Sequence, residues 1–280
     1  MAEPSRARSA DRAGLVGPGL RLARLLGRHR QVLAATTRVE LEKRYSGSLL
    51  GRAWIVLYPV LWLAIYLFVY LVVFKVRYRS YSTLDYVVYI FSGLVPYIAV
   101  MEAVTAGVVS VKQNLHLVRN IILPVEMIPA RAVGMALVSE VVGLAMLLAL
   151  DLASGSGSPR LAVLPLALAI EATYLLGVAM FLAPLGVLFP DVGYFTNLLV
   201  LFVLFVSPIA FKPAALPVGY HFIVWANPVY YLLLPFRLAT LPATGWDWAS
   251  LLAAGAIALV TYFVGAAFFA RAKPHLVDYD

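Results

Sequence analysis

The segment Ala53–Phe74 reads AWIVLYPVLWLAIYLFVYLVVF and contains no charged side chain. An α-helix needs about 20 mostly apolar residues to cross the hydrocarbon core of a bilayer. This segment meets that length and is the cleanest apolar run in the chain. It therefore predicts a first membrane-spanning helix over residues 53–74.

The composition of the whole chain agrees with this prediction. Of the 280 residues, 62% are hydrophobic and 13% are charged, whereas globular chains average about 45–50% apolar and about 25% charged residues. The chain has no cysteine, which excludes disulfides, thiolate metal sites and thiol nucleophiles. We therefore expect one membrane domain over residues 53–270, preceded by a short polar arm.

Further apolar segments are long enough to span a membrane, and charges interrupt them rarely. They cover residues 84–110, 128–150, 161–188, 192–211 and 248–270. A helix satisfies its own backbone hydrogen bonds, which the interior of a bilayer requires. The sequence therefore predicts an all-α polytopic membrane protein with six transmembrane helices.

Residues 213–236 are also uncharged, but they contain Pro213, Pro217, Pro228 and Pro235. Proline removes a backbone donor and kinks the interior of a helix. A straight seventh span is therefore not expected. Two re-entrant half-helices at the extracytoplasmic side of the membrane fit this segment better.

Basic residues are concentrated at the N-terminus, where 11 of the 22 Lys and Arg precede residue 53. The positive-inside rule places this arm in the cytoplasm, against membrane lipid rather than nucleic acid. We expect residues 1–18 to be disordered and residues 19–52 to form an amphipathic interface segment. Six spans then place the tail, residues 271–280, in the cytoplasm as well.

One basic cluster contradicts the positive-inside rule, because Lys75, Arg77 and Arg79 follow the first span on the expected outer side. Inverting the topology would move the larger N-terminal cluster outward instead. The three side chains are candidates for binding a lipid headgroup or a phosphate. Ordinary snorkelling at the interface explains them equally well.

The motifs of common enzymes are absent from the sequence. It contains no GxxxxGK[ST] phosphate loop, no HExxH metal motif and no GxSxG nucleophile elbow. We therefore expect no catalytic residue, bound cofactor or metal, so that any transport would use an ion gradient or a partner. Glu102, Glu140 and Glu171 lie within spans and are candidates for a proton relay. Polar contacts between helices are the preferred interpretation.

A partner is indicated between the second and third spans. Val111, Leu115, Val118 and Ile122 recur at helical spacing, and Pro124 ends the pattern. A short amphipathic helix in a cytoplasmic loop can dock into a groove on a soluble protein. The periodicity alone fits a helix lying on lipid equally well.

Five motifs between residues 38 and 270 together resemble the membrane subunits of bacterial polysaccharide ABC exporters, the type-2 ABC permeases that move O-antigen, teichoic acid, capsule or cell-wall galactan. They are YSGSLLGRAW (45–54), FSGLVPY (91–97), LVRN with LPVEMIP (117–129), SPIAF (207–211) and ANP (226–228). One departure is FPD at residues 189–191, where the family often has an Arg-Asp pair. In this chain Asp191 is present, but the arginine of the pair is absent.

The resemblance implies a pore of two copies in the bacterial inner membrane, each copy binding a cytoplasmic ATPase that carries ATP and Mg²⁺. Both termini would be cytoplasmic. The residues that couple ATP binding to the pore would be Lys112, Gln113, Leu115, His116, Val118, Arg119 and Asn120. The alternatives are a small-molecule or drug exporter on the same scaffold and a membrane scaffold that transports nothing.

Aromatic residues supply an independent argument about the substrate. Tyr58, Trp62, Tyr66 and Tyr70 recur every fourth residue and form a stripe on the first span, and Tyr97 lies in the second. An aromatic ring joins an apolar face to a polar handle, which suits a passing sugar ring. Bundle packing and interfacial belts are the alternative explanation. Together with the resemblance, these five residues are candidates for a glycan channel.

Overall fold

The computed structural model of the chain describes residues 14–76, 82–114, 124–153, 159–241 and 247–277. Every regular element within these ranges is helical, which confirms the all-α prediction. Among the described residues, five helical runs are long and apolar enough to cross a membrane. They are Gly51–Val73, Thr83–Gln113 (α4), Met127–Ala153 (α6), Pro159–Leu188 and Trp248–Val277 (α11).

Two of these runs change helical type along their length. The first begins with η2 (Gly51–Ala53), continues as α3 (Trp54–Leu67) and ends in the π-helical turn η3 (Phe68–Val73). The other begins with η4 (Pro159–Val163) and continues as α7 (Leu164–Leu188). All five runs agree with predicted spans to within a few residues, except that α11 extends past residue 270.

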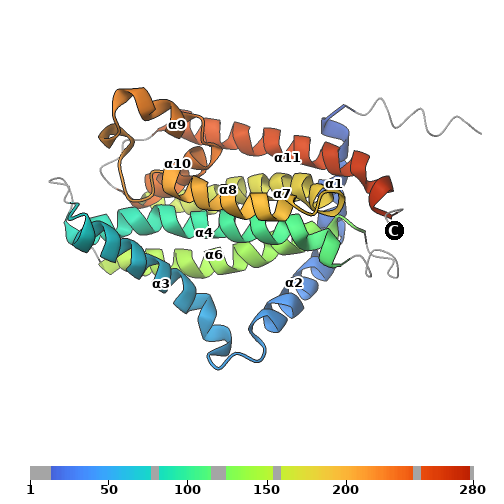
Figure 1. The fold of residues 1–280 in the computed structure, drawn as a ribbon, viewed down its shortest axis with the longest axis horizontal. Coiled ribbons are helices and arrows are strands. Elements are labelled where there is room, and N and C mark those ends of the chain that lie inside the picture. Colours follow the sequence, from blue (N-terminus) through green and yellow to red (C-terminus); the bar gives the residue numbers. More distant parts are fainter. Residues whose placement is uncertain (1–13, 77–81, 115–123, 154–158, 242–246, 278–280) are drawn as a thin grey trace, which may run out of the picture.

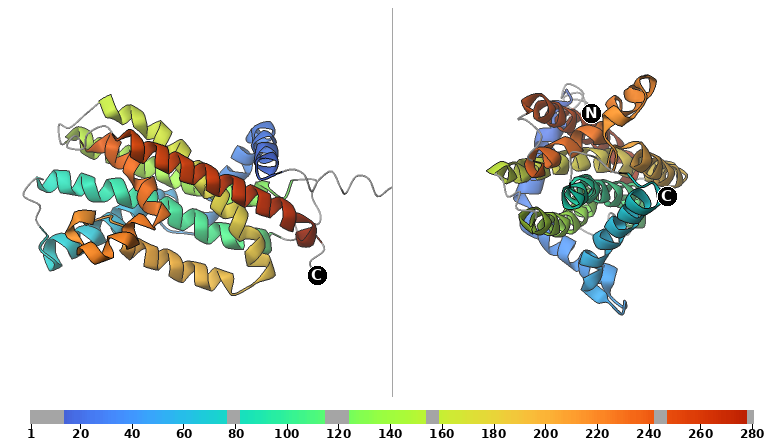
Figure 2. Two further views of the ribbon diagram at one scale, coloured as in Figure 1. Left: turned by 90° about the horizontal axis from the view of Figure 1, so that it is seen from above. Right: turned by 90° about the vertical axis from the view of Figure 1, so that its left-hand side faces the viewer.

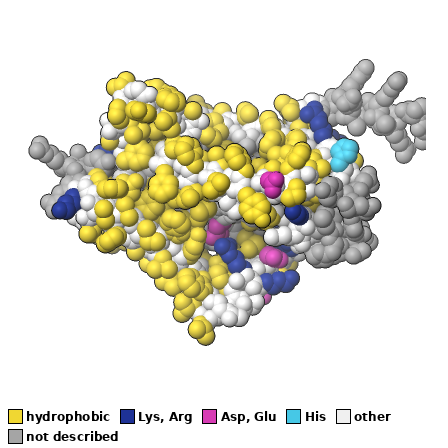
Figure 3. Space-filling view, viewed as in Figure 1, with side chains coloured by type: hydrophobic (Ala, Val, Ile, Leu, Met, Phe, Trp, Pro, Cys, Tyr) yellow, Lys and Arg dark blue, Asp and Glu magenta, His cyan; other side chains and the backbone are white. Residues whose placement is uncertain are grey.

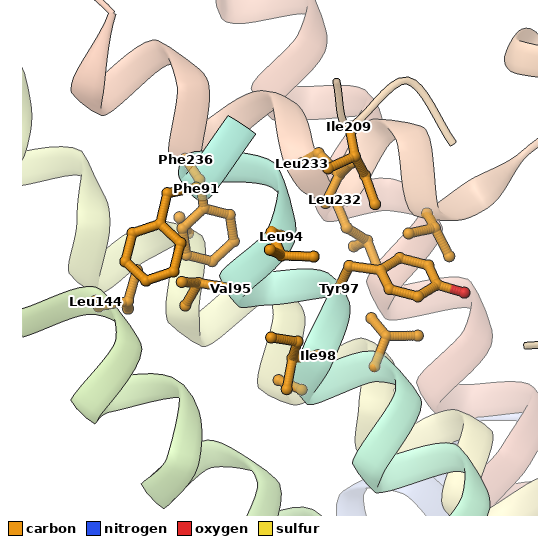
Figure 4. Close-up of a cluster of buried hydrophobic side chains, with 14 of the residues drawn as sticks. Phe91, Leu94, Val95, Tyr97, Ile98, Leu144, Ile209, Leu232, Leu233 and Phe236 are labelled. Atoms are coloured by element: carbon orange, nitrogen blue, oxygen red, sulfur yellow. The ribbon is translucent and has the colours of Figure 1, made fainter. Parts of the chain in front are cut away.

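The helix α4 lies at the centre of the bundle and contacts α3, α6, α7 and two shorter helices (Figure 1). It begins with a capping box: the hydroxyl of Ser82 accepts from the N–H of Asp85, and the carboxylate of Asp85 accepts from the N–H of Ser82. Its apolar side chains form the main core. Phe91, Leu94 and Val95 are buried there against residues of α6 and of α10 (Pro228–Thr240) (Figure 4).

A close helix contact joins α7 to α11 and depends on two glycines. A Cβ atom built on Gly177 would lie 2.5 Å from the backbone of Thr261, and one built on Gly265 would overlap the carbonyl of Gly177. Without side chains at these positions the two backbones can touch, which is a common basis of helix packing in membranes.

The predicted fifth span ends earlier than expected. The helix α8 covers Val192–Val206, and Ser207 is already extended, with ψ of 134°. The cause is Pro208, which disfavours helical backbone in the preceding residue. At 1.5 Å per residue, these 15 residues rise about 22 Å, so α8 alone is shorter than the hydrocarbon core.

The proline-rich segment is broken, as the sequence predicted. It contains η5 (Pro213–Ala215), η6 (Val218–Tyr220), α9 (His221–Trp225) and α10 (Pro228–Thr240). The run Val218–Trp225 is bent by 86° from α10. Asn227 begins α10 by accepting from the N–H of Val229. Both α9 and α10 lie at the left-hand end in Figure 1.

In the part of the arm that the structure describes, two helices precede the bundle, α1 (Val16–Arg28) and α2 (Arg30–Tyr45). The helix α1 therefore begins at Val16, inside the stretch that was expected to be disordered. Pro18 does not prevent this start, because proline is tolerated in the first turn of a helix. The helix α1 crosses the end of α11, and α2 and α3 form a V that projects from one side of the bundle (Figure 2). The C-terminal ends of α4 and α11 lie at the same end of the bundle as α1 (Figure 1).

Candidate functional site

The predicted aromatic stripe forms a continuous row of rings along α3 and η3. The ring centroids of Tyr58 and Trp62 are 6.3 Å apart, those of Trp62 and Tyr66 6.4 Å, and those of Tyr66 and Tyr70 5.8 Å. Phe74 extends the row at 5.7 Å from Tyr70. Each ring therefore touches the next, as a fourth-residue repeat on a helix predicts.

The stripe faces the bundle. Tyr66 is buried, and Tyr58, Trp62 and Tyr70 are partly buried against the main core. Away from the stripe, α3 and η3 expose aliphatic and aromatic residues, including Val60, Ile65 and Phe68. Exposed apolar side chains also cover much of the face shown in Figure 3.

The space between the stripe and the bundle is closed in this conformation. Where the lower end of α3 meets α4 and α6, a pocket of only about 10 Å³ lies among Tyr58, Glu102 and Glu140. That volume holds about one water molecule. A sugar ring can pass along the stripe only if α3 moves away from α4.

Tyr97 lies on α4 and is buried in the core (Figure 4). Its hydroxyl donates to the carbonyl oxygen of Val200 on α8. This contact ties α8 to the central helix. The role of Tyr97 in a glycan channel stays a prediction, as do those of the four stripe residues.

The arm is joined to the bundle by an ion pair that the sequence does not reveal. The guanidinium of Arg44 on α2 donates to both carboxylate oxygens of Glu102 on α4, at 3.1 and 3.3 Å. Burial lowers the pKa of Arg44, but the Glu102 carboxylate more than offsets it, so the pKa is raised and the guanidinium stays charged. Glu102 thus makes the polar contact between helices that was preferred for it.

A second polar network joins the arm to the ends of α4 and α6. Arg131 on α6 lies 3.5 Å from the carboxylate of Glu40 on α2. It also donates to the side-chain oxygen of Asn114, whose amide donates to the carbonyl of Ser110 on α4. One guanidinium therefore connects three helices beside the segment predicted to contact an ATPase.

Of the predicted coupling residues, Lys112 and Gln113 form the exposed last turn of α4. The second span therefore extends beyond its predicted end at residue 110. The remaining coupling candidates lie outside the described residues: Leu115, His116, Val118, Arg119 and Asn120. Their predicted role stays a prediction.

The outer basic cluster is described only at its first residue. Lys75 is exposed just beyond η3 and has a φ of 51°, a left-handed conformation that side-chain-bearing residues adopt rarely. This turn ends the first helical run. Arg77 and Arg79 lie outside the described residues.

Glu140 on α6 and Glu171 on α7 are almost fully buried, and their carboxyl groups face each other. Within the described ranges, none of their four carboxyl oxygens has a hydrogen-bond partner of good geometry. The structure therefore brings together two of the three candidates for a proton relay, and that role stays a prediction.

The irregular backbone after α8 is satisfied by three side chains. Arg237 on α10 donates to the carbonyls of Pro208 and Ile209, the latter at 3.0 Å. On α4, Tyr86 donates to the carbonyl of Ala210 at 2.9 Å, and Tyr89 donates to that of Phe211 at 2.8 Å.

The four successive carbonyls of residues 208–211 therefore all have donors, which buried non-helical backbone in a membrane requires. The guanidinium of Arg237 also lies 4.2 Å from the ring of Tyr89. These roles were not predicted from the sequence. A lone arginine in an apolar segment was the available signal, since such a charge needs partners.

Comparisons with known proteins agree with this architecture. The family model of the ABC-2 type transporter matches residues 30–241. An O-antigen export system permease protein RfbA of Myxococcus xanthus is 24% identical over 262 residues, covering 92% of this chain and 99% of the relative. One of Klebsiella pneumoniae is 24% identical over 209 residues, covering 74% and 78%. The chain therefore belongs to the ABC-2 type transporter family.

Proposed function

We propose that the chain is the pore-forming membrane subunit of an ATP-driven exporter of a lipid-linked polysaccharide. The observation that carries the proposal is the extent of the similarity. The family match covers α2 of the arm and the broken segment at residues 213–236, and the likeness to the Myxococcus xanthus O-antigen export permease extends over 92% of the chain.

The proposed assembly contains two copies of the chain, each with a cytoplasmic ATPase that binds ATP and Mg²⁺. Two exposed apolar faces support contact with lipid and a second copy. One is the outer side of α3. The other is the outer side of α8, whose exposed members are Tyr194, Phe195, Leu198, Leu199, Leu201, Phe202 and Phe205. Contiguous exposed apolar faces of this kind indicate a protein–protein interface or a contact with lipid.

The two polar networks support a mechanical route from the ATPase to the pore. A displacement of the segment after α4 would act directly on Asn114 and Arg131, and through Glu40 on α2. The Arg44–Glu102 pair ties the last turn of α2 to α4. Because α2 leads directly into α3, moving the arm would tilt the aromatic stripe away from the bundle.

In this mechanism ATP binding opens the space between α3 and α4, and the row of rings then faces the passage. Sugar rings present C–H faces and hydroxyl groups, which aromatic side chains bind weakly and repeatedly. The polysaccharide would leave past α9 and α10, at the end of the bundle opposite the arm. We place that end on the extracytoplasmic side of the inner membrane.

Co-expression with candidate ATPases tests the assembly. We expect one ATPase to co-purify with the full-length chain, and its ATP turnover to rise when a lipid-linked glycan is added. Leu115→Asp and Arg119→Glu should abolish co-purification. Val218→Asp at the opposite end is the matched control and should retain it, because Val218 is exposed and far from the arm.

The alternatives predict different results. A drug exporter would show ATP turnover stimulated by small apolar compounds and not by the glycan. A membrane scaffold would show no substrate-stimulated turnover with any ATPase. Unchanged co-purification of the Leu115→Asp and Arg119→Glu variants would contradict the proposed coupling segment.

A further inference from the structure

A pocket lies between α1, α7 and α11, at the end of the bundle where the arm begins. Its volume is about 560 Å³, within the range of about 300–1,000 Å³ typical of sites for small molecules. Its floor is apolar and mostly buried, and consists of Leu22, Leu25, Met180, Ala266, Ala267 and Phe269.

Charged side chains surround the mouth of this pocket. Arg21 comes from α1, Arg271 and Lys273 from the end of α11, and Glu126 from the turn before α6. Lys273 is already neutralised, because its amine lies 2.6 Å from Oε1 of Glu126. Within the described ranges Arg21 and Arg271 have no ion-pair partner, so two uncompensated positive charges lie over an apolar floor.

Glu126 offers a further recognition element. Its second carboxylate oxygen, Oε2, is buried and has no hydrogen-bond partner within the described residues. A buried carboxylate oxygen without a donor is costly. A ligand that brings a hydroxyl group to this position would remove that cost, and its anion would lie on the two arginines.

The position of the pocket fits the surface of a membrane. The helix α1 runs crosswise to α11 (Figure 1), and it exposes Leu15, Val16 and Leu20 beside its arginines. A crosswise amphipathic helix lies in the plane of the interface, with its apolar side toward the acyl chains. Phosphate groups of lipids lie at this same depth.

The pocket is also separated from the aromatic stripe. The stripe lies on the helix that contacts α4 and α6, whereas the pocket is lined by residues of α1, α7 and α11. The helices α3 and α11 lie on opposite sides of the bundle (Figures 1 and 2). A lipid in this pocket would therefore remain in place while a substrate moved along α3.

We propose that this pocket binds an anionic phospholipid whose headgroup carries hydroxyl groups, the chemistry of phosphatidylglycerol. The phosphate lies between Arg21 and Arg271, a headgroup hydroxyl donates to Oε2 of Glu126, and an acyl chain covers the apolar floor. The bound lipid joins α1 to α11 and so fixes the start of the arm. This inference does not rest on the proposed transport function.

Native mass spectrometry of the full-length chain in detergent tests the proposal, with phosphatidylglycerol and phosphatidylcholine of identical acyl chains as probes. We expect saturable binding of phosphatidylglycerol at least tenfold tighter than that of phosphatidylcholine. Each arginine near an anionic phosphate contributes a factor of about 5 in affinity. Arg21→Gln with Arg271→Gln should therefore weaken phosphatidylglycerol binding about 25-fold.

Arg24→Gln with Arg28→Gln is the matched control, because these exposed arginines lie on α1 but do not line the pocket. The control should bind as the wild type does. Equal binding of the two lipids, or equal losses in the two double variants, would overturn the site. Phosphatidylmethanol has the same charge without a headgroup hydroxyl, and binding as tight as that of phosphatidylglycerol would overturn the role of Glu126.

A lipid-linked pyrophosphate supplies a further arm of the test. The short-chain isoprenoid pyrophosphate should not displace phosphatidylglycerol at equal concentration. Displacement that Arg21→Gln with Arg271→Gln abolishes would assign the pocket to the transported lipid and overturn the proposal. Because these readouts require neither an ATPase nor transport, their failure is distinguishable from failure of the proposed function.

Discussion

The helices α3 and α4 are both apolar enough to cross a membrane, yet the fold uses them in opposite ways. In an apolar stretch of 18 residues from each run, 83% of the residues are buried in α4. In the run that contains α3, only 11% are buried. Helix α4 is held by neighbours on all sides, whereas α3 touches the bundle along its aromatic stripe. Hydrophobicity therefore identifies both spans, but only packing shows that α4 is the central core helix and that α3 is attached to the bundle along one side.

The largest expected effect is on the core, at the contact between α7 and α11. Gly265→Leu would force a side chain into the backbone of Gly177. We expect a loss of about 3 kcal/mol in the free energy of unfolding, since overpacked sites relax poorly. Thermal unfolding in detergent, followed by size-exclusion chromatography, measures this loss.

The same substitution at another glycine of α11 is the control. Gly255 has nothing within 4 Å of a built Cβ atom, so Gly255→Leu should unfold as the wild type does. Equal effects of the two substitutions would show that the α7–α11 contact is not the fixed part of the bundle.

A smaller loss is expected where the core holds the irregular backbone after α8. Arg237→Met removes the donors to the carbonyls of Pro208 and Ile209. Leaving them unpaired should cost about 2–3 kcal/mol of unfolding free energy. Arg237→Lys should recover part of this loss, because an ammonium can reach one carbonyl but lacks the planar fork. Identical stabilities of the two variants would contradict the contacts described for Arg237.

Substitutions at the contact between the arm and the bundle should cost less stability. Arg44→Gln or Glu102→Gln breaks the ion pair between α2 and α4. We expect a loss of about 1 kcal/mol in the free energy of unfolding, because Arg44 is partly exposed. The charge-swapped double variant Arg44→Glu with Glu102→Arg should regain part of this stability. A double-mutant cycle by thermal unfolding measures the coupling, and a coupling energy of zero would show that the pair does not fix the arm.

The smallest effect is expected at the exposed start of α11. The side chain and backbone of Ser250 donate to Asp247 and lower its pKa. A carboxyl whose folded pKa is lowered contributes stability at neutral pH and loses it as pH falls through that pKa. Asp247→Asn should therefore cost no more than about 0.5 kcal/mol at neutral pH. In thermal unfolding this difference should shrink as the pH falls below about 4, where a free carboxyl becomes protonated. A difference that grows toward acid would contradict this assignment.

Much of the fold follows from the sequence because an apolar segment of sufficient length has few other stable states in lipid. The long helices were predicted for that reason, whereas the break at residues 213–236 was predicted from its four prolines. The early end of α8 was missed, although Pro208 is a readable signal at Ser207. The helical start at Val16 was missed because the composition of residues 1–18 predicted disorder. The packing of α1 on α11 cannot be read from that composition.

The candidate site was less predictable, because its contacts join distant residues. The fourth-residue repeat predicted the row of rings, but not that it faces α4. Glu102 was recognised as a charge in need of a partner, yet Arg44 is 58 positions away along the chain. Arg237 and the carbonyls that it holds likewise come together only through tertiary packing. Sequence spacing specifies the face of one helix but not its neighbour.

Export through the aromatic stripe is the central claim, and transport of a lipid-linked polysaccharide into proteoliposomes containing the chain and its ATPase tests it most directly. We compare Trp62→Ala with Tyr66→Ala on the stripe, and Val60→Ala with Ile65→Ala on the outer face of α3, after confirming that both double variants assemble and bind ATP. We predict that the stripe variant loses most ATP-dependent transport while the outer-face variant retains it. Equal transport by the two variants would contradict the account.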